Sequence, residues 1–196
     1  MSAFGATDNP TTTNDAEIET MAENLANFVK DNHFDGVDLD YEDSASMQNG
    51  NGVTFLVSLT QKLRAKLPGY IITHAPQGPY FNAAYHFIEV DQQVGNLIDF
   101  YNVQFYNQGS GYEYETYDGL FKNAYTTSVK EIIDQGVPAE KVVVGKPATP
   151  ADISGAGYVS MADLANWTVM AFNEFNWSAG LMFWQYSSDL TGNLMK

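Results

Sequence analysis

The sequence predicts an α/β fold in which helices cover a parallel β-sheet. Six short runs rich in β-forming residues alternate along the chain with longer segments whose apolar residues recur at helical spacing. Such alternation is typical of strand–helix–strand units, whose strands pair in parallel. The chain has 196 residues, which is enough for one sizeable core, so we expect a single domain over residues 1–196. The predicted strands are residues 2–6, 34–42, 70–75, 100–106, 141–146 and 180–186.

Four helices are expected between these strands. The first covers residues 14–32, where Leu25 and Val29 lie one helical turn apart. Asn14 and Glu17 stand three residues apart at its start, which is the spacing of a capping box. The other predicted helices are residues 53–67, 120–135 and 161–175.

Composition and charge narrow the class of partner. The chain is 44% hydrophobic and 17% charged, which is an ordinary balance for a globular domain. Its net charge of -15 repels nucleic acid and anionic membrane surfaces, so a neutral polymer or small ligand is the expected partner. No apolar run approaches the about 18 residues of a membrane span, and the first residues lack the basic and apolar regions of a signal peptide. There are no cysteines, and His33, His74 and His86 match no zinc-binding spacing, so no metal or other cofactor is expected.

The run from Phe34 to Glu42, Phe-Asp-Gly-Val-Asp-Leu-Asp-Tyr-Glu, carries the chemistry. On a strand, successive side chains point to opposite faces, so Asp38, Asp40 and Glu42 share one face and the intervening apolar residues share the other. Residues two apart on a strand lie roughly 6 to 7 Å apart, so these carboxyl groups can share hydrogen bonds and protons. Crowded carboxylates in a sheltered site raise one pKa, which keeps a proton available to a general acid.

Two simpler interpretations of this acidic face remain. Alternating acids can line the solvated face of an antiparallel edge strand, or they can bind a hard cation such as calcium or magnesium through oxygen. The segment follows one helical stretch and precedes another, which favours a buried parallel strand over a hairpin. Gly36, just before the acids, also indicates a close approach of two backbones at this point.

The DGVDLDYE segment at residues 35–42 resembles the DGxDxDxE signature of family 18 glycoside hydrolases. Four further segments are similar, in the same order, to the single-domain chitinases of fungi and plants. The resemblance covers nearly the whole chain and implies a (β/α)8 barrel, in which the active site lies at the carboxyl ends of the strands. The four segments are YIITHAPQGPYF at 70–81, NVQFYNQ at 102–108, KVVVGKPATP at 141–150 and GLMFWQYSSD at 180–189.

Such barrels usually need about 250 residues, so this chain accounts for a truncated barrel of about six strand–helix units. By the resemblance, the segment that begins at Ser2 corresponds to the family's third strand, and the first two units and a final helix are missing. An open sheet would expose unpaired backbone along the strands near Ser2 and Phe183. We therefore expect that the chain either forms a homodimer through these edges or repacks its ends, and that it is either a natural short form or a fragment.

The resemblance also implies a mechanism and a set of site residues. In this family the substrate's own N-acetyl group is the nucleophile, an exception to the usual two-carboxylate scheme. Glu42 would be the general acid, Asp40 and Tyr106 would stabilise the oxazolinium intermediate, and Asp38 would share a proton with Asp40. The residues that would bind the sugar are Gln104, Asn107, Trp184, Gln77 and Tyr80. The tyrosines at 112, 114 and 117 would either extend the cleft or lie on a solvated loop.

Two classes of function follow. The first is a chitinase that hydrolyses β-1,4 linkages between N-acetylglucosamine units of chitin or chito-oligosaccharides, because every acidic and aromatic position of the signature is present. The second is a lectin-like chitin-binding protein with a decayed active site, because the barrel is incomplete. Members of the resembled family are secreted, but the sequence shows no signal peptide, so it predicts no localisation for this form.

Overall fold

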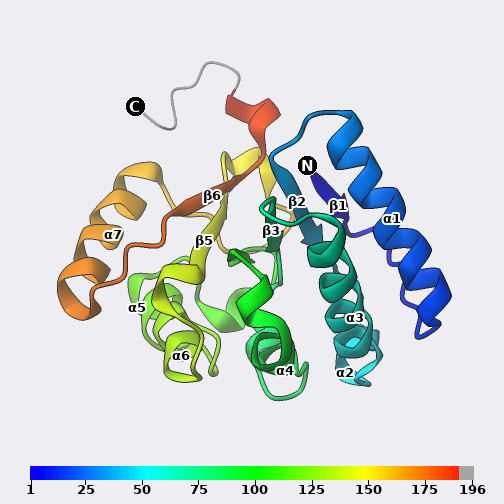
Figure 1. Ribbon diagram of the computed structural model, residues 1–196. Helices are drawn as coiled ribbons and strands as arrows, with labels where there is room; N and C mark the ends of the chain where they lie inside the picture. The colour runs from blue at the N-terminus through cyan, green and yellow to red at the C-terminus, as the bar shows by residue number, and fades with distance from the viewer. Residues whose placement is uncertain (190–196) are drawn as a thin grey trace. The chain divides into compact units, whose positions relative to one another are not determined.

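The computed structural model describes residues 1–189 (Figure 1). It confirms the α/β class and all six predicted strands: β1 (Ser2–Phe4), β2 (Gly36–Asp40), β3 (Ile71–His74), β4 (Phe100–Gln104), β5 (Val142–Pro147) and β6 (Leu181–Trp184). The strands pair in chain order, and the registers resolved between neighbours are parallel. The α-helices are α1 (Asp15–Asp31), α2 (Ser44–Gln48), α3 (Asn51–Lys66), α4 (Phe87–Val94), α5 (Tyr117–Phe121), α6 (Val129–Asp134) and α7 (Met161–Phe175).

The described chain divides into two compact units. The first comprises Met1–Pro76 and Tyr80–Tyr101, and the second comprises Gln77–Pro79 and the chain from Asn102 onward. The boundary falls within β4, whose first residues, Phe100 and Tyr101, pair with β3 in the first unit. The expectation of a single domain over residues 1–196 stays a prediction.

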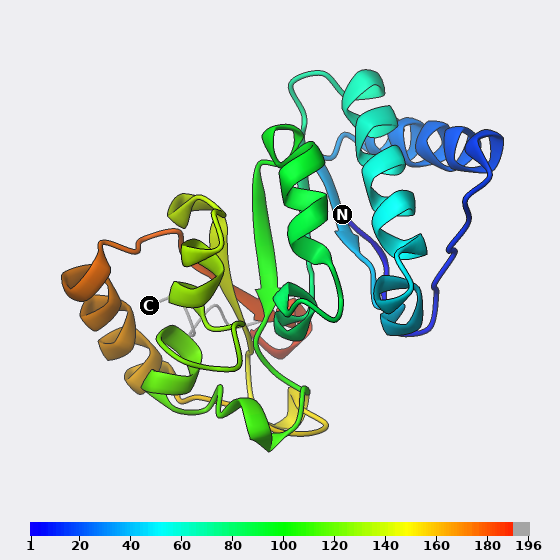
Figure 2. The ribbon, with the colours of Figure 1, turned by 90° about the horizontal axis from the view of Figure 1, so that it is seen from below.

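In the first unit, β2 is the central strand and pairs with β1 on one side and β3 on the other. Helices α1 and α3 pack against each other beside these strands (Figures 1 and 2). Gly36 starts β2 where the prediction of close backbone approach is confirmed: a Cβ there would lie 2.0 Å from the carbonyl oxygen of Ile71. Only glycine allows β2 and β3 to pair at this position.

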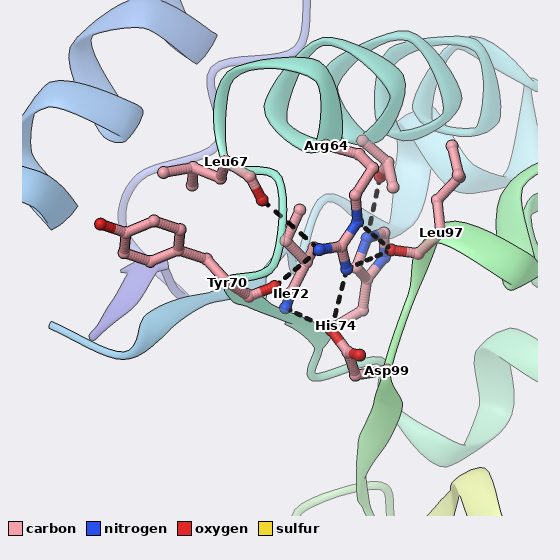
Figure 3. Close-up of polar contacts among 8 residues, drawn as sticks. Arg64, Leu67, Tyr70, Ile72, His74, Leu97 and Asp99 are labelled. Atoms are coloured by element: carbon pink, nitrogen blue, oxygen red, sulfur yellow. Dashed lines mark hydrogen bonds and ion pairs between the residues drawn. The ribbon is translucent and has the colours of Figure 1, made fainter.

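A guanidinium group secures the amino-terminal ends of β3 and β4 (Figure 3). Arg64 of α3 donates to the carbonyl oxygens of Leu97, at 2.7 and 3.1 Å, and Tyr70, at 2.6 Å. It also pairs with the Asp99 carboxylate at 2.8 Å, and the same oxygen of Asp99 accepts the backbone N–H of Ile72 at 2.7 Å. The planar fork of arginine can serve several acceptors at once, so this side chain connects both strands to α3.

His74 is fully buried at the end of β3 and packs edge-on against Phe87 and Tyr101. The Thr60 hydroxyl donates to the carbonyl oxygen of Leu56 at 2.6 Å and lies 3.0 Å from Nε2 of His74. Burial lowers the pKa of His74 to about 3, so the ring is neutral.

The second unit contains β5, β6 and α7. Six residues of β5 are buried, and β6 pairs with it in parallel from Leu181 to Trp184. Trp177, in the segment that joins α7 to β6, is buried; its indole contacts the ring of Phe121 and donates to the carbonyl oxygen of Val142 at 2.8 Å. The predicted helix at 161–175 is confirmed in full as α7.

The prediction of one continuous helix over residues 120–135 is wrong. The segment is interrupted between α5 and α6, where Tyr125 and Thr126 have the positive φ angles 53° and 71°, which a helix cannot contain. Ser128 and Glu131 then form a capping box that starts α6. The intervening turn thus follows from backbone conformations that no period in the sequence reveals.

The first helix, α1, matches its prediction, but its predicted capping box is absent. The Asn14 side chain accepts the N–H of Ala16 at 3.0 Å, while the Asn14 backbone N–H binds the hydroxyl of Thr12 rather than the Glu17 side chain. Glu17 instead accepts from the Thr12 hydroxyl at 2.5 Å. Helices α2 and α4 were not predicted, because α2 has five residues and α4 has eight, too few for a clear period.

Candidate active site

Strand β2 carries the acidic motif, and the predicted alternation of its faces is confirmed. Val37, Leu39 and Tyr41 are buried, each at most 2% exposed, whereas the three acidic side chains are half-buried on the opposite face. The apolar face packs into the core of the first unit, where Tyr41 lies against the ring of Phe55. Hydrophobic burial of one face thus forces the carboxylates onto the other.

Asp38 is held between two hydroxyl groups from the neighbouring strands. Its Oδ2 accepts from Oγ of Ser2 on β1 at 2.9 Å, and its Oδ1 accepts from Oγ1 of Thr73 on β3 at 2.6 Å. Ser2 and Thr73 are the register partners of Asp38 in the two parallel pairings. Each carboxylate oxygen therefore has a fixed donor, and the orientation of the group is set by the sheet itself.

Asp40 is the last residue of β2, and Glu42 lies two residues beyond it, because the strand ends before the predicted boundary at residue 42. Asp40 pairs in register with Phe4, and a Cβ at Gly5 would lie 3.7 Å from its Oδ2. Glu42 lies close enough to Tyr80 for its charge to act on that phenol. Burial, with a further contribution from Glu42, raises the pKa of Tyr80 well above its usual range, so Tyr80 is a neutral hydroxyl.

The chain turns into α2 directly after Glu42. Asp43 is the cap of that helix and accepts from the N–H and hydroxyl of Ser46 at 2.9 and 2.6 Å and from the Thr11 hydroxyl at 2.9 Å. Burial alone would raise the pKa of Asp43, but these hydrogen bonds lower it overall. An ionised cap therefore holds the backbone that follows Glu42.

In the second unit, Gln104 and Tyr106 stand at the end of β4 and are 6% and 5% exposed. Gln77 forms an isolated parallel bridge with Gln104. Asn107 follows with a positive φ of 63°, and its Oδ1 accepts the N–H groups of Ser154 and Gly155 at 2.9 and 3.1 Å. The amide oxygen of Asn107 therefore organises the loop after β5.

The aromatic candidates fall into two groups. Trp184 ends β6 and is 46% exposed, as a side chain that stacks on a ligand must be. Tyr80 is buried, lies 3.1 Å from the Ser44 hydroxyl and stacks on Tyr85, so it supports the fold of the first unit. Tyr114 is also buried, with its hydroxyl 2.5 Å from Thr127. A role of Tyr80 in sugar binding stays a prediction.

Three further residues, none of them a predicted site residue, contribute to the two units. Ser2 and Thr73 meet Asp38, and Lys146 on β5 is a fully buried lysine in the second unit. Strand register would have indicated the two hydroxyls, since both are partners of Asp38. Lys146 lies in an apolar run that predicts a buried strand, and a charged residue at such a position was the only indication in the sequence that this side chain has a special role.

Two features of the described residues concern other classes of function. Within residues 1–189, no three His, Asp or Glu side chains are grouped so that they could hold a metal ion. No helix in that part of the chain has the length and apolar character needed to cross a membrane.

Comparisons with known proteins give a consistent answer. The family model of "Glycosyl hydrolases family 18" matches residues 3–190. A solved GH18 chitinase from Pseudoalteromonas aurantia is 34% identical, with a TM-score of 0.80 over 100% of this chain and 72% of that one. A "Chitinase 1" from Aphanocladium album is 31% identical over 67% of this chain, and a "Chitinase" from Enterococcus faecalis is 25% identical over 88% of it.

These similarities also define the fold and the extent of the match. The predicted fold class, a (β/α)8 barrel family represented by about six strand–helix units, is confirmed by the six parallel strands and by the structural match. The chain spans 35% of the Aphanocladium album protein, 54% of the Enterococcus faecalis protein and 11% of "Chitinase ChiA" from Flavobacterium johnsoniae.

Proposed function

Because this chain belongs to family 18 of the glycosyl hydrolases, we propose that it hydrolyses β-1,4 linkages between N-acetylglucosamine units, with Glu42 as the general acid. The observation that supports this proposal most directly is the alternation along β2 and the two residues after it, where Asp38, Asp40 and Glu42 are half-buried and the intervening Val37, Leu39 and Tyr41 are buried. The similar proteins from Pseudoalteromonas aurantia, Aphanocladium album and Enterococcus faecalis are all chitinases by name.

In the proposed reaction, Glu42 donates its proton to the glycosidic oxygen as the bond from that oxygen to the anomeric carbon breaks. The carbonyl oxygen of the substrate's N-acetyl group forms a bond to the same carbon, which gives an oxazolinium ion. Asp40 offers negative charge to the nitrogen of this ion, and the Tyr106 hydroxyl donates to its oxygen. Glu42, now ionised, takes a proton from the water that opens the ring and restores the sugar with its original configuration.

Asp38 is proposed to act through Asp40. The hydroxyls of Ser2 and Thr73 each donate to one oxygen of Asp38, so its carboxylate is oriented and has donors that compensate its charge. A proton shared between Asp38 and Asp40 allows Asp40 to change hydrogen-bond partners as Glu42 changes charge. The two hydroxyls are therefore part of the proposed machinery.

Sugar binding is proposed for Gln104, Asn107, Trp184, Gln77 and Tyr80. The exposed indole of Trp184 offers an apolar face on which a pyranose ring can stack. Two solved structures of GH18 chitinase from Cycas revoluta have a similar fold, with TM-scores of 0.69 and 0.68; a double mutant was solved with (GlcNAc)4 and the other with (GlcNAc)3. Oligomers of this length are therefore the natural probes. A lectin-like role without turnover is not favoured, because the named relatives are chitinases.

The test compares Glu42→Gln with wild type on a soluble N-acetylglucosamine tetramer. We expect the substitution to lower kcat by about 100-fold or more, because a positioned general acid contributes about 10²–10⁴ to the rate, while the tetramer still binds in calorimetry. Glu23→Gln is the matched control, since Glu23 is exposed on α1. Early products should be the β-anomer by NMR. Binding without product release by wild type, or equal rates for Glu42→Gln and wild type, would contradict the proposal.

A further inference from the structure

We propose that Lys146 is a positioning residue that holds Tyr106 in place through three backbone carbonyl groups. This inference rests on the proposed function, because the proposed reaction requires the Tyr106 hydroxyl to be held in a fixed position. It concerns the second unit alone, and its evidence is the set of contacts around the Lys146 ammonium group.

Lys146 is buried with no exposed surface, and its Nζ donates to three carbonyl oxygens. These belong to Phe105 at 2.8 Å, Tyr114 at 2.7 Å and Gly157 at 3.0 Å. An ammonium group has three N–H donors, so every one of them is used. The three carbonyls come from the residue directly after β4, from the loop beyond that residue and from the loop that follows β5.

A buried lysine is costly, which makes its presence informative. Burial lowers the pKa of Lys146 to about 7, against an opposing contribution from the charge of Glu115. A leucine or methionine would fill the same volume without this cost. The hydrogen bonds to three converging carbonyls are what the lysine adds, so the function of this side chain lies in the segments that it joins.

One of these segments packs directly on the backbone of Tyr106. A Cβ at Gly157 would lie 2.7 Å from Cα of Tyr106 and 2.8 Å from the carbonyl oxygen of Phe105, and Gly157 has a positive φ of 108°. Only glycine permits this approach. The Gly157 carbonyl that binds Lys146 therefore belongs to a residue in van der Waals contact with Tyr106.

The other side of Tyr106 is tied to the same loop by Asn107. Its backbone N–H donates to the carbonyl oxygen of Ala156 at 2.8 Å, and its Oδ1 accepts from Ser154 and Gly155. Residues 154–157 are thus bound to Asn107 at one end and through Lys146 to Phe105 at the other. Tyr106 lies between these two attachments, so loss of either one frees its backbone to shift.

A double-mutant cycle tests whether Lys146 acts through the Tyr106 hydroxyl. In the 196-residue chain, we expect Lys146→Met to lower kcat on the N-acetylglucosamine tetramer by about 10- to 100-fold, as a misplacement of about 1 Å does, with little change in KM. In the Tyr106→Phe background the same substitution should cost less than about threefold. If the two losses multiply instead, the inference is overturned.

The same cycle separates this inference from the proposed function. If wild type releases no product, or Tyr106→Phe is as active as wild type, it is the proposed function that fails. The positioning of Tyr106 is then decided by amide hydrogen exchange followed by NMR, which needs no turnover. We expect the N–H groups of Asn107, Ser154 and Gly155 to exchange at least about tenfold faster in Lys146→Met, while amides of β2 and β3 keep their rates. Unchanged rates at these three amides would overturn the inference.

A second variant keeps the test decisive if Lys146→Met does not fold. Gly157→Ala retains the lysine and pushes a methyl group against Tyr106, so it should produce the same loss of kcat and the same faster exchange. Gly111→Ala is the matched control, because a Cβ at Gly111 meets nothing within 4 Å. Equal behaviour of Gly157→Ala and Gly111→Ala would contradict the positioning of Tyr106 by this loop.

Discussion

Replacement of Gly36 by alanine should destabilise the first unit strongly. The added Cβ would lie 2.0 Å from the carbonyl oxygen of Ile71, 2.7 Å from its carbonyl carbon and 2.8 Å from its Cβ. Two of these are backbone atoms of the paired strand β3, so no rotamer change relieves the clash. Strands β2 and β3 must move apart at the point where Gly36 and Ile71 pair.

The size of the effect follows from two contributions. Overpacking of a well-packed region costs about 1–3 kcal/mol. Separation of the strands also weakens a hydrogen bond from the N–H of Ile71 to the carbonyl oxygen of Asp35, now 3.0 Å long, and a hydrogen bond of this kind contributes about 0.5–1.5 kcal/mol. We therefore expect the free energy of unfolding to fall by about 3 kcal/mol.

The assay is urea denaturation followed by far-UV circular dichroism. Tryptophan fluorescence is the complementary probe of the second unit, because Trp167, Trp177 and Trp184 all lie there. Gly111→Ala is the control and should change the free energy of unfolding by less than about 0.5 kcal/mol, as surface substitutions usually do. The expected loss for Gly36→Ala is about 3 kcal/mol, so a loss below about 1 kcal/mol would refute the reasoning from backbone contact.

Three further predictions concern pH, an arginine and association. The pKa of His74 is about 3 in the folded chain and 6.5 in the unfolded chain, so the unfolded chain binds more protons between these values and stability falls as the pH falls. Between pH 7 and pH 5 the free energy of unfolding should drop by about 2 kcal/mol from this cause. In urea denaturation, His74→Gln should abolish this part of the pH dependence. Arg64→Met should lower the free energy of unfolding by about 2–3 kcal/mol, because hydrogen bonds of a charged donor are lost. Arg64→Lys should restore less than half of this loss, since an ammonium group lacks the planar fork that reaches the carbonyl oxygens of Leu97 and Tyr70 and the Asp99 carboxylate together. The chain should sediment as a homodimer at micromolar concentration if β1 and β6 pair with a second copy, and a monomer at all concentrations would contradict that pairing.

The sequence determined those features that depend on neighbouring residues. The alternation of acids with Val37, Leu39 and Tyr41 specified both faces of β2, because the period of a strand is local. All six strands and the full extent of α7 followed from such periods and from their bounding residues. Gly36 likewise predicted a close approach of two backbones, because the residue type at one position is also local information.

The tertiary structure decided which distant residues meet. Ser2 and Thr73 lie 36 and 35 positions from Asp38, and only the register of three parallel strands brings both hydroxyls to one carboxylate. Lys146 binds carbonyl groups that lie 41, 32 and 11 positions away in the sequence, so no short segment of the chain contains all three partners. Contacts of this kind depend on how whole elements pack, and packing is a property of the folded chain rather than of any local pattern.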